Sequence, residues 1–399
     1  MTGLLSLPEA QALLLEGTLP LAPERIAVAD ASGRYLAADL TAARTQPAAD
    51  LSAMDGYAMR ADDLAGPWRV VGESAAGHPF AGELGPGEAV RISTGALLPE
   101  RAGAVLLQEN ATRAGDHVAL NGAGEPSARH TRRAGFDFRA SDVLLRAGTR
   151  LGPAQLALAI SGGQALVDVH GVPSVVVVDS GDELAADPAN CAAYQIPASN
   201  GAMLAALAAP FSGSVRRIGP VADRLEALAG ALAKAEGTDV VVTSGGVSVG
   251  DHDLIRPALE AWGAEIGFWR VAMRPGKPLL VARKGGTTVL GLPGNPVSSY
   301  VTAFFFLLPL LRRLAGAGDP LPRAVPAMLA GDLPGGGSRA EFLRARLAGQ
   351  RVAALGEQDS SALRTLAAAN ALIARPSGAP PAAAGTLVPV YRLENGGIT

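Results

Sequence analysis

The chain has 399 residues, a formal net charge of −3 and a single cysteine, Cys191. A nearly neutral charge without lysine or arginine runs argues against a nucleic-acid surface, and one cysteine excludes internal disulfides and thiolate metal clusters. Hydrophobic residues make up 48% of the chain, so it can bury a sizeable core and form about two to four domains.

The sequence carries no signal for export or for a membrane span. No basic residue precedes Arg25, which argues against a secretory leader. The most apolar run, 301–311, contains Pro309 and is shorter than the roughly 18–20 residues that cross a bilayer, so it predicts a buried helix. We therefore expect a cytoplasmic protein with no membrane partner.

The predicted secondary structure changes twice in the first half of the chain. Ser6 and Glu9 have capping-box spacing and predict a helix over 7–16 that ends at Gly17. Short β-type segments separated by glycine and proline then predict a small β-rich domain. These segments lie at 68–71, 89–92 and 104–107. Residues 144–169 return to helix and strand patterns.

From residue 172 onward, apolar strands alternate with helices. The continuous apolar segment 175–178 is typical of a strand buried on both faces of a parallel sheet. Helices are predicted over 200–209, 221–236 and 253–262. After Arg313 glycine, proline and alanine accumulate and strands such as 387–391 return, which predicts a separate C-terminal β domain with a long turn at 377–385.

Three glycine-rich turns follow apolar segments between residues 238 and 299. The first ends a strand at Ser244, Gly245 and Gly246, whose missing Cβ atoms let backbone N–H groups approach an anion. The second holds cations around a stiff Pro-Gly pair; they are Arg270, Arg274 and Lys277. The third ends a strand and opens a helix with free N–H groups; it reads Leu292, Pro293, Gly294, Asn295 and Pro296.

Each turn alone also occurs in ordinary structural connections. All three turns connect the end of a strand to a following helix or hairpin. Such turns lie at the edge where open α/β sheets bind ligands. Two carboxylates, Asp251 and Asp253, follow the first turn. Anion donors beside carboxylates predict a phosphorylated ligand with a divalent cation.

The segments TSGGVSVGDHD, MRPGKP and LPGNPVS resemble the molybdopterin molybdenumtransferases, the molybdenum-insertion enzymes of molybdenum cofactor synthesis. Further motifs of that family follow in order at 52–58, 91–96, 104–109, 132–137 and 180–184. An ordered series is far more specific than one glycine loop. The resemblance implies an enzyme that removes AMP from adenylylated molybdopterin and inserts molybdenum from molybdate.

The resemblance also implies a multidomain α/β plus β architecture. A linking and dimerisation domain would comprise 1–44 and 138–171, with an inserted β-rich domain at 45–137. A doubly wound α/β molybdopterin-binding domain would follow at 172–316, and a C-terminal β-barrel-like domain at 317–399. The family forms homodimers with a site assembled between subunits. A molybdopterin adenylyltransferase and maturation proteins of downstream molybdoenzymes are implied as further partners.

Roles for individual residues follow from the matched motifs. Asp55, Asp137 and Asp253 are implied to be catalytic. Glu183 and Asp253 are the candidates for Mg²⁺, which would stabilise charge as the phosphoanhydride is cleaved. Substrate or anion contacts are implied for a larger set: Thr94, Ser180, Gly181, Asp182, Ser244, Gly245, Gly246, Arg270, Arg274, Lys277, Pro293, Asn295, Pro296, Arg344 and Ser360.

The implied chemistry sets requirements on these groups. Molybdate is a tetrahedral dianion and favours a cationic site with hydroxyl or N–H donors, which suits Lys277, Arg344 and Ser360. Exchanging oxo ligands for sulfur consumes protons. Asp55 and Asp137 would deliver them if burial or neighbouring acids raise their pKa values.

Ordinary structural roles fit several of the same residues. Asp55 precedes Gly56 in a common hairpin signal, and Asp137 follows two arginines in a pattern typical of a surface ion pair. Ser180 or Asp182 fits the N-cap of a following helix. Arg344, on a strand predicted over 339–344, fits a solvated surface arginine.

The chain departs from the family pattern in three places. Arg270 and Arg274 replace lysines, which preserves anion binding but removes neutral-amine chemistry. Asp179 stands where a serine or a similar residue is commoner. The segment 196–200 replaces an aspartate-containing motif while keeping Asn200.

Two other functions remain open. A molybdopterin adenylyltransferase shares the glycine-rich α/β domain but lacks the 52–58 motif and the extra β domains. A non-catalytic cofactor carrier or scaffold, as the related gephyrin domain is, would bind the cofactor without releasing AMP. The sequence does not separate molybdenum from tungsten, because the two oxyanions have nearly the same size and charge.

Overall fold

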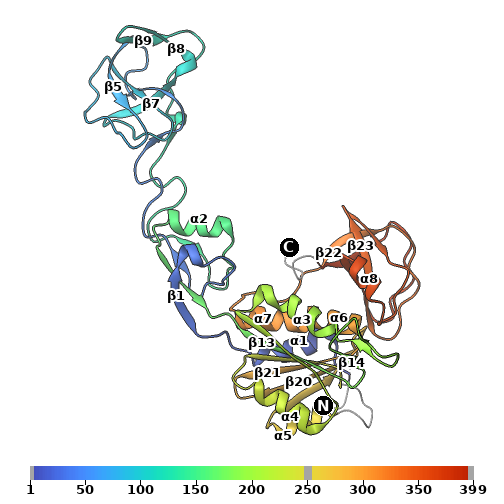
Figure 1. The fold of residues 1–399 in the computed structure, drawn as a ribbon. Helices are drawn as coiled ribbons and strands as arrows, with labels where there is room; N and C mark the ends of the chain where they lie inside the picture. Colours follow the sequence, from blue (N-terminus) through green and yellow to red (C-terminus); the bar gives the residue numbers. More distant parts are fainter. Residues whose placement is uncertain (1–3, 247–253, 394–399) are drawn as a thin grey trace. The chain divides into compact units, whose positions relative to one another are not determined.

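The computed structural model describes residues 4–246 and 254–393, and the chain divides into two compact units. The first unit comprises Met1–Glu24 and Val169–Thr399, and the second comprises Arg25–Asp168. Figure 1 labels their helices and strands. Asp253, for which a catalytic and a metal-binding role are predicted, lies outside the described residues.

A six-stranded sheet forms the centre of the first unit, in the order β16-β13-β17-β21-β20-β18. The first four strands are parallel, and β20 pairs antiparallel with both β21 and β18 at one side. The valines at 175–178 are buried, as the apolar pattern predicted. The strands are β16 (Ser214–Val221), β13 (Ser174–Ser180), β17 (Val240–Ser244), β21 (Thr287–Leu292), β20 (Pro278–Lys284) and β18 (Glu265–Arg270).

Helices cover both faces of this sheet (Figure 1). On one face lie α4 (Leu225–Lys234) and α5 (Ile255–Ala261). On the other lie α1 (Leu7–Glu16), α3 (Asn200–Ala208), α6 (Pro296–Thr302) and α7 (Leu308–Leu314). The predicted bounds and capping box of α1 are confirmed: Ser6 N–H donates to Glu9 Oε2 at 2.8 Å.

The helix predicted over 221–236 is wrong at its beginning. Val221 ends β16, and α4 begins only at Leu225. β16 is an edge strand, and edge strands tolerate a proline such as Pro220, so the Gly-Pro pair does not end the strand. The shift matters because it places Asp223 just beyond the carboxyl end of a strand.

The apolar run 301–311 lies in a longer helix. α6, a π-helical segment (Ala303–Leu307) and α7 form one stretch, Pro296–Leu314, of 19 residues. Its length and composition would suffice to cross a bilayer, but 89% of its most apolar window is buried inside the protein. The predicted buried helix is therefore confirmed, although the helix extends beyond the apolar run.

Pro309 is accommodated inside this helix by a side chain from α1. Proline has no N–H to donate to the carbonyl four residues earlier, which here belongs to Phe305. Gln11, which is 7% exposed, donates instead from Nε2 to Phe305 O at 2.8 Å. A π-helical turn next to the proline is a common way for a helix to widen around such a residue.

A closed five-stranded barrel follows the α/β domain. Its order is β23-β24-β22-β26-β25, and β25 pairs back with β23. The strands are β22 (Val325–Leu329), β23 (Ala340–Ala348), β24 (Arg351–Ala354), β25 (Ala371–Arg375) and β26 (Leu387–Arg392), with α8 (Leu363–Ala368) beside them. β19 (Met273–Arg274) pairs with β23, so the turn that carries Arg274 is joined to the barrel.

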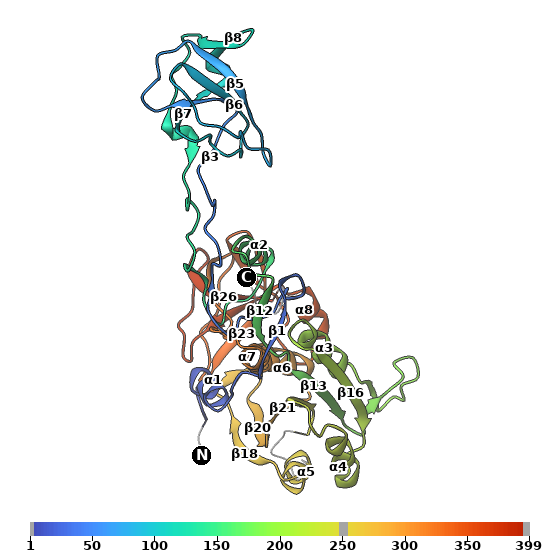
Figure 2. The ribbon, with the colours of Figure 1, turned by 90° about the vertical axis from the view of Figure 1, so that its left-hand side faces the viewer.

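The second unit is β-rich, with a six-stranded sheet in the order β7-β4-β6-β5-β9-β8 (Figure 2). The three strands predicted here are confirmed in longer form, and Trp68 is fully buried between them. The sheet strands are β7 (Ala102–Leu107), β4 (Gly56–Arg60), β6 (Glu88–Ile92), β5 (Trp68–Ser74), β9 (His117–Leu120) and β8 (Ala111–Ala114).

Short two-stranded pairs and one helix complete this part of the chain. The helix is α2 (Pro153–Ser161). The pairs are β1 (Pro23–Ala27) with β12 (Leu166–His170), β2 (Leu40–Thr41) with β11 (Val143–Leu145), and β3 (Leu51–Ser52) with β10 (Thr131–Arg132).

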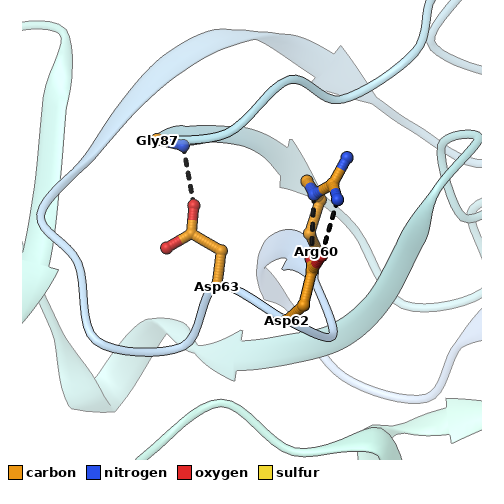
Figure 3. A network of polar contacts seen from close by, with 4 residues as sticks. All are labelled: Arg60, Asp62, Asp63 and Gly87. Atoms are coloured by element: carbon orange, nitrogen blue, oxygen red, sulfur yellow. Dashed lines mark hydrogen bonds and ion pairs between the residues drawn. The ribbon is translucent and has the colours of Figure 1, made fainter.

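Carboxylates fix the turn after β4 (Figure 3). Asp62 accepts two hydrogen bonds from Arg60, from Nε at 2.9 Å and from Nη2 at 2.6 Å. Asp63 Oδ2 accepts from the N–H of Gly87 at 2.7 Å, and the carbonyl of Asp63 accepts from Trp68 Nε1 at 3.0 Å. In this unit, a carboxylate that accepts a hydrogen bond from a backbone N–H can therefore have a purely structural role. The same alternative applies to Asp55.

Replacing Gln11 tests its role at Pro309. We expect Gln11→Ala to lower the free energy of unfolding by about 1–3 kcal/mol, because it leaves a buried carbonyl without a donor. In a Pro309→Ala background the cost should shrink, since alanine supplies the missing N–H. A double-mutant cycle by chemical denaturation measures both. An equal cost in the two backgrounds would contradict this account.

Candidate functional site

Three parallel strands of the central sheet end at the same level. Asp179 of β13 pairs with Ser244 of β17, and Ser244 pairs with Leu292 of β21. The turns that follow these strands therefore meet at one edge. This is the carboxyl edge at which open α/β sheets bind ligands.

A pocket of 800 Å³, called here the acidic pocket, opens at this edge. Its charged lining consists of Asp179, Glu183 and Asp223, and no lysine, arginine or histidine of the described ranges lines it. The rest comes from the predicted turns and their neighbours: Ser180, Gly181, Leu184, Ile196, Pro197, Ala198, Ser199, Asn200, Ser244, Gly245, Gly246, Pro278, Pro293, Gly294, Asn295, Pro296, Ser361 and Leu363.

The first predicted turn requires glycine. Gly245 has φ +95°, and a Cβ there would lie 2.6 Å from the carbonyl oxygen of Ser180. Its N–H donates to Leu292 O at 3.2 Å, which ties two of the three turns together. A side chain at this position would therefore strain the backbone and separate the strand ends.

Ser180 and Asp182 do not cap a helix. After β13 the chain forms the short pair β14 (Leu184–Ala185) and β15 (Ile196–Pro197), and the N-cap of the next helix, α3, is Ser199. The N-cap interpretation is therefore wrong. The Ser180 hydroxyl is buried and has no hydrogen-bond partner among the described residues.

Acidic groups gather at one side of the acidic pocket. Asp182 is not in the lining, but its Oδ1 accepts from the N–H of Asp223 at 3.1 Å. Burial raises the pKa of Asp223, and the charges of Asp182 and Glu183 add to this effect. Asp223 was missed from the sequence because it lay inside the segment predicted as helix.

Asp179 is a buried carboxylate in the wall of the acidic pocket. Its exposed fraction is 2%, and Arg217 Nη2 lies 3.6 Å from its Oδ2. Its other oxygen, Oδ1, has no hydrogen-bond partner among the described residues. Burial raises the pKa of Asp179, opposed by Arg217 and the N–H of Gly201. Any Cβ at position 201, on α3, would collide with the carboxylate.

A second pocket, of 480 Å³, lies between the α/β domain and the barrel of the same unit and is called here the cationic pocket. Four cations line it against two carboxylates, Glu341 and Asp359. The cations are Arg274, Lys277, Arg339 and Arg375. The other lining residues are Pro275, Gly276, Pro278, Ser298, Pro334, Gly335, Phe342, Leu343, Gln358 and Ser360.

Two of these arginines were not predicted as site residues. Arg339 Nη1 donates to Met273 O at 3.2 Å, which ties the barrel to the basic turn. Arg375, 5% exposed, donates from Nη2 to the carbonyls of Pro334 and Pro380, while its Nη1 has no partner among the described residues. Charge alone does not reveal such residues, because most strand arginines are solvated.

The two pockets are direct neighbours. Pro278 lines both, and the consecutive residues Ser360 and Ser361 line one each. Asn295, in the acidic pocket, donates from Nδ2 to Ser360 Oγ, in the cationic pocket, at 3.0 Å. A surface lined by carboxylates and a surface lined by cations therefore lie side by side.

Two arginines that were predicted as anion contacts, Arg270 and Arg344, lie outside the lining of both pockets. Arg270 is exposed at the end of β18. Arg344 is 1% exposed and donates from Nη2 to Glu357 O at 2.8 Å, so the interpretation as a solvated arginine is wrong. Burial lowers the pKa of Arg344. Its contacts hold the loop that leads to Gln358 and Ser360.

Three predicted residues belong to the second unit. Asp55 is exposed, and its Oδ1 accepts from the N–H of Thr94 at 2.6 Å. This hydrogen bond lowers the pKa of Asp55, whereas a role as proton donor would need an increase. Asp137 is also exposed, and its N–H donates to Gln46 O at 3.0 Å. The neighbouring Arg133 pairs with Asp50 at 2.5 Å.

Three family models match consecutive parts of the chain. Residues 5–163 match the family model described as "MoeA N-terminal region (domain I and II)". Residues 176–313 match "Probable molybdopterin binding domain", and residues 326–393 match "MoeA C-terminal region (domain IV)".

Curated relatives match most of the chain. A molybdopterin molybdenumtransferase of Haemophilus influenzae is 35% identical over 78% of both chains. Molybdopterin molybdenumtransferase 2 of Mycobacterium tuberculosis is 34% identical over 97% of this chain and 99% of its own. A solved structure of the molybdopterin biosynthesis moeA protein from Pyrococcus horikoshii has a TM-score of 0.83 at 27% identity, covering 97% of this chain and 99% of that one.

An acidic pocket at the carboxyl edge of the sheet and a cationic pocket beside the barrel define a multidomain α/β plus β protein. The matches along the chain make the class specific. The chain belongs to the molybdopterin molybdenumtransferase family.

The buried Asp179 carboxylate should cost stability at neutral pH. We expect Asp179→Asn to raise the free energy of unfolding by on the order of 1 kcal/mol at pH 7, because the amide avoids burying an incompletely paired charge. Since the folded-state pKa is raised, the difference should vanish as the pH falls below the ordinary value of 3.8, where both states are protonated. Denaturation curves from pH 3 to 7 measure this. A variant that is less stable throughout would contradict it.

Proposed function

We propose that this chain inserts molybdenum from molybdate into adenylylated molybdopterin and releases AMP. The observation that carries the proposal is the contact between the acidic and cationic pockets through Asn295 and Ser360. A pterin or nucleotide ring in one pocket would place its sulfur or phosphate groups beside the other. Family membership supports molybdopterin as the ligand, since the curated relatives are named for this reaction.

The cationic pocket is the proposed molybdate site. Lys277, Arg339 and Arg375 supply charge-assisted donors, and Ser360 supplies a hydroxyl. Arg375 is fixed by two backbone carbonyls, so it needs little reorganisation to meet an anion. Arg344 is a positioning residue in this proposal, because it holds the loop on which Ser360 lies.

The acidic pocket is the proposed site of the ring system and of Mg²⁺. Magnesium in proteins is commonly held by one or two carboxylates together with substrate phosphates, so Glu183 and Asp223 fit it. Among the described residues, no group of three or more histidine, cysteine, aspartate or glutamate side chains is arranged to hold a metal ion by itself. Bound there, the ion would neutralise charge on the phosphoanhydride as AMP leaves.

Proton handling is assigned to the acids of the second unit. Asp55, ionised and held by the Thr94 N–H, is suited to accept a proton or to orient a donor. Asp137 stays the proposed proton donor for the oxygen that leaves molybdate as water.

The decisive measurement is AMP release and metal insertion from adenylylated molybdopterin with Mg²⁺, with and without molybdate. We expect AMP release that depends on molybdate. Tight binding without AMP release would instead indicate a cofactor carrier. Consumption of ATP with free molybdopterin would indicate an adenylyltransferase.

Variants test the proposed roles of individual residues in the same assay. Asp55→Ala should reduce turnover by about a hundredfold or more, as loss of a general acid or base usually does. Asp50→Ala is the matched control, because Asp50 also accepts a backbone N–H in the second unit, from Ala134 at 2.8 Å. Equal losses in both variants would make Asp55 structural.

Lys277→Met should raise the molybdate concentration needed for half-maximal AMP release.

We also propose that the active form is the homodimer that the family resemblance implies. The resemblance implies a site that residues of both subunits complete, so specific activity should fall as the chain is diluted through its dissociation range. Sedimentation measures the dissociation in the same samples. Activity that is unchanged in a demonstrably monomeric sample would rule out a shared site.

A further inference from the structure

The two carboxylate oxygens of Asp179 have different surroundings. Oδ2 faces Arg217 at 3.6 Å, and α3 approaches the carboxyl so closely at Gly201 that no side chain fits there. Oδ1 is buried, lacks a partner among the described residues and belongs to a group that lines the acidic pocket. A buried polar atom of this kind is normally paired, so its partner is most simply a ligand.

The chemistry of the pocket restricts what that partner is. A carboxylate oxygen accepts hydrogen bonds, so the ligand must present an N–H or O–H donor. No lysine, arginine or histidine of the described residues lines this pocket, and two further carboxylates do. A bare phosphate or other oxyanion is therefore disfavoured at Asp179, whereas an amino-substituted heterocycle is favoured.

We propose that Asp179 is a specificity residue whose free Oδ1 accepts a hydrogen bond from the exocyclic amino group of a heterocycle bound in the acidic pocket. The inference rests on the proposed function, because adenylylated molybdopterin carries two such groups. One is the 2-amino group of the pterin, and the other is the 6-amino group of adenine. Both present the same donor chemistry.

Two positions in the lining of the acidic pocket differ in charge. Asp179 lines the pocket from β13, and Ala198 lines it from the segment that leads into α3. The pocket thus has a carboxylate on the strand and none at Ala198.

Two pairs of probes test the proposal by equilibrium binding to the full chain. Pterin (2-amino-4-oxopteridine) is compared with lumazine, in which a carbonyl replaces the 2-amino group. AMP is compared with IMP, in which a carbonyl replaces the 6-amino group. We expect wild type to prefer the amino member of one pair by at least about tenfold, since a buried acceptor facing a carbonyl stays unpaired. The pair that shows the preference identifies the ring.

Asp179→Asn gives the sharper readout. Its amide can keep an oxygen toward Arg217 and α3 and turn its NH₂ toward the pocket, which converts the acceptor into a donor. The preference should then reverse toward lumazine or IMP. A residue that merely shapes the pocket would weaken both members of a pair alike. Leu363→Ala changes the same lining without removing a hydrogen-bonding group and should keep the wild-type preference.

The outcomes separate this inference from the proposed function. Equal binding of both members in both pairs, an unchanged preference in Asp179→Asn, or no measurable binding of any probe overturns the role of Asp179, even if wild type inserts molybdenum. A preference that reverses in Asp179→Asn supports the contact, even if wild type releases no AMP. In that case the proposed reaction fails and the recognition of the ring stands.

Discussion

The register of the parallel strands is the constraint on which the site depends. Asp179, Ser244 and Leu292 occupy paired positions on β13, β17 and β21, so three loops distant in sequence begin at one level. Gly245 holds this arrangement, because its N–H bonds to Leu292 while its missing Cβ leaves room for the Ser180 carbonyl. A slip of one residue would turn Asp179 to the opposite face, away from α3 and the pocket.

Charge is divided between the two pockets in a way that single motifs do not reveal. The turn that carries Arg274 and Lys277 contributes to the cationic pocket, while the glycine turn of β17 contributes to the acidic one. The barrel enforces the division, since β19 pairs with β23 and brings Arg339 to the basic turn. Asn295 and Ser360 bridge the boundary, so a bound ring and a bound oxyanion would lie on opposite sides of one hydrogen bond.

Local sequence signals predicted elements well where one short-range rule decides. The capping box at Ser6 and Glu9, the valines of β13 and the proline that opens α6 are all found as predicted. The prediction failed at Val221, where a neighbouring strand decides: Pro220 is tolerated because β16 is an edge strand. Pro309 lies in a helix that was predicted, but the helix accommodates it because Gln11 supplies the donor that the helix lacks. Neither partner is visible within a local window.

The candidate site shows the same limit. Glycine turns and Lys277 follow from spacing and resemblance, and they line the pockets. Asp223 was hidden by a misplaced helix start. Arg339 and Arg375 were not selected because their burial and their carbonyl partners depend on how the barrel closes. Arg344 was selected for its motif, but burial places it behind the loop it supports.

Asp179 shows how a single residue of the sequence gains meaning from the structure. In sequence it is one acid at the end of an apolar strand. In the fold it is a buried charge with Arg217 beside one oxygen and no partner for the other among the described residues. Such a group destabilises the free protein, yet it is already desolvated and held in place before a ligand arrives. The ligand then meets an acceptor that loses no further hydration, which favours recognition of an N–H donor over a carbonyl.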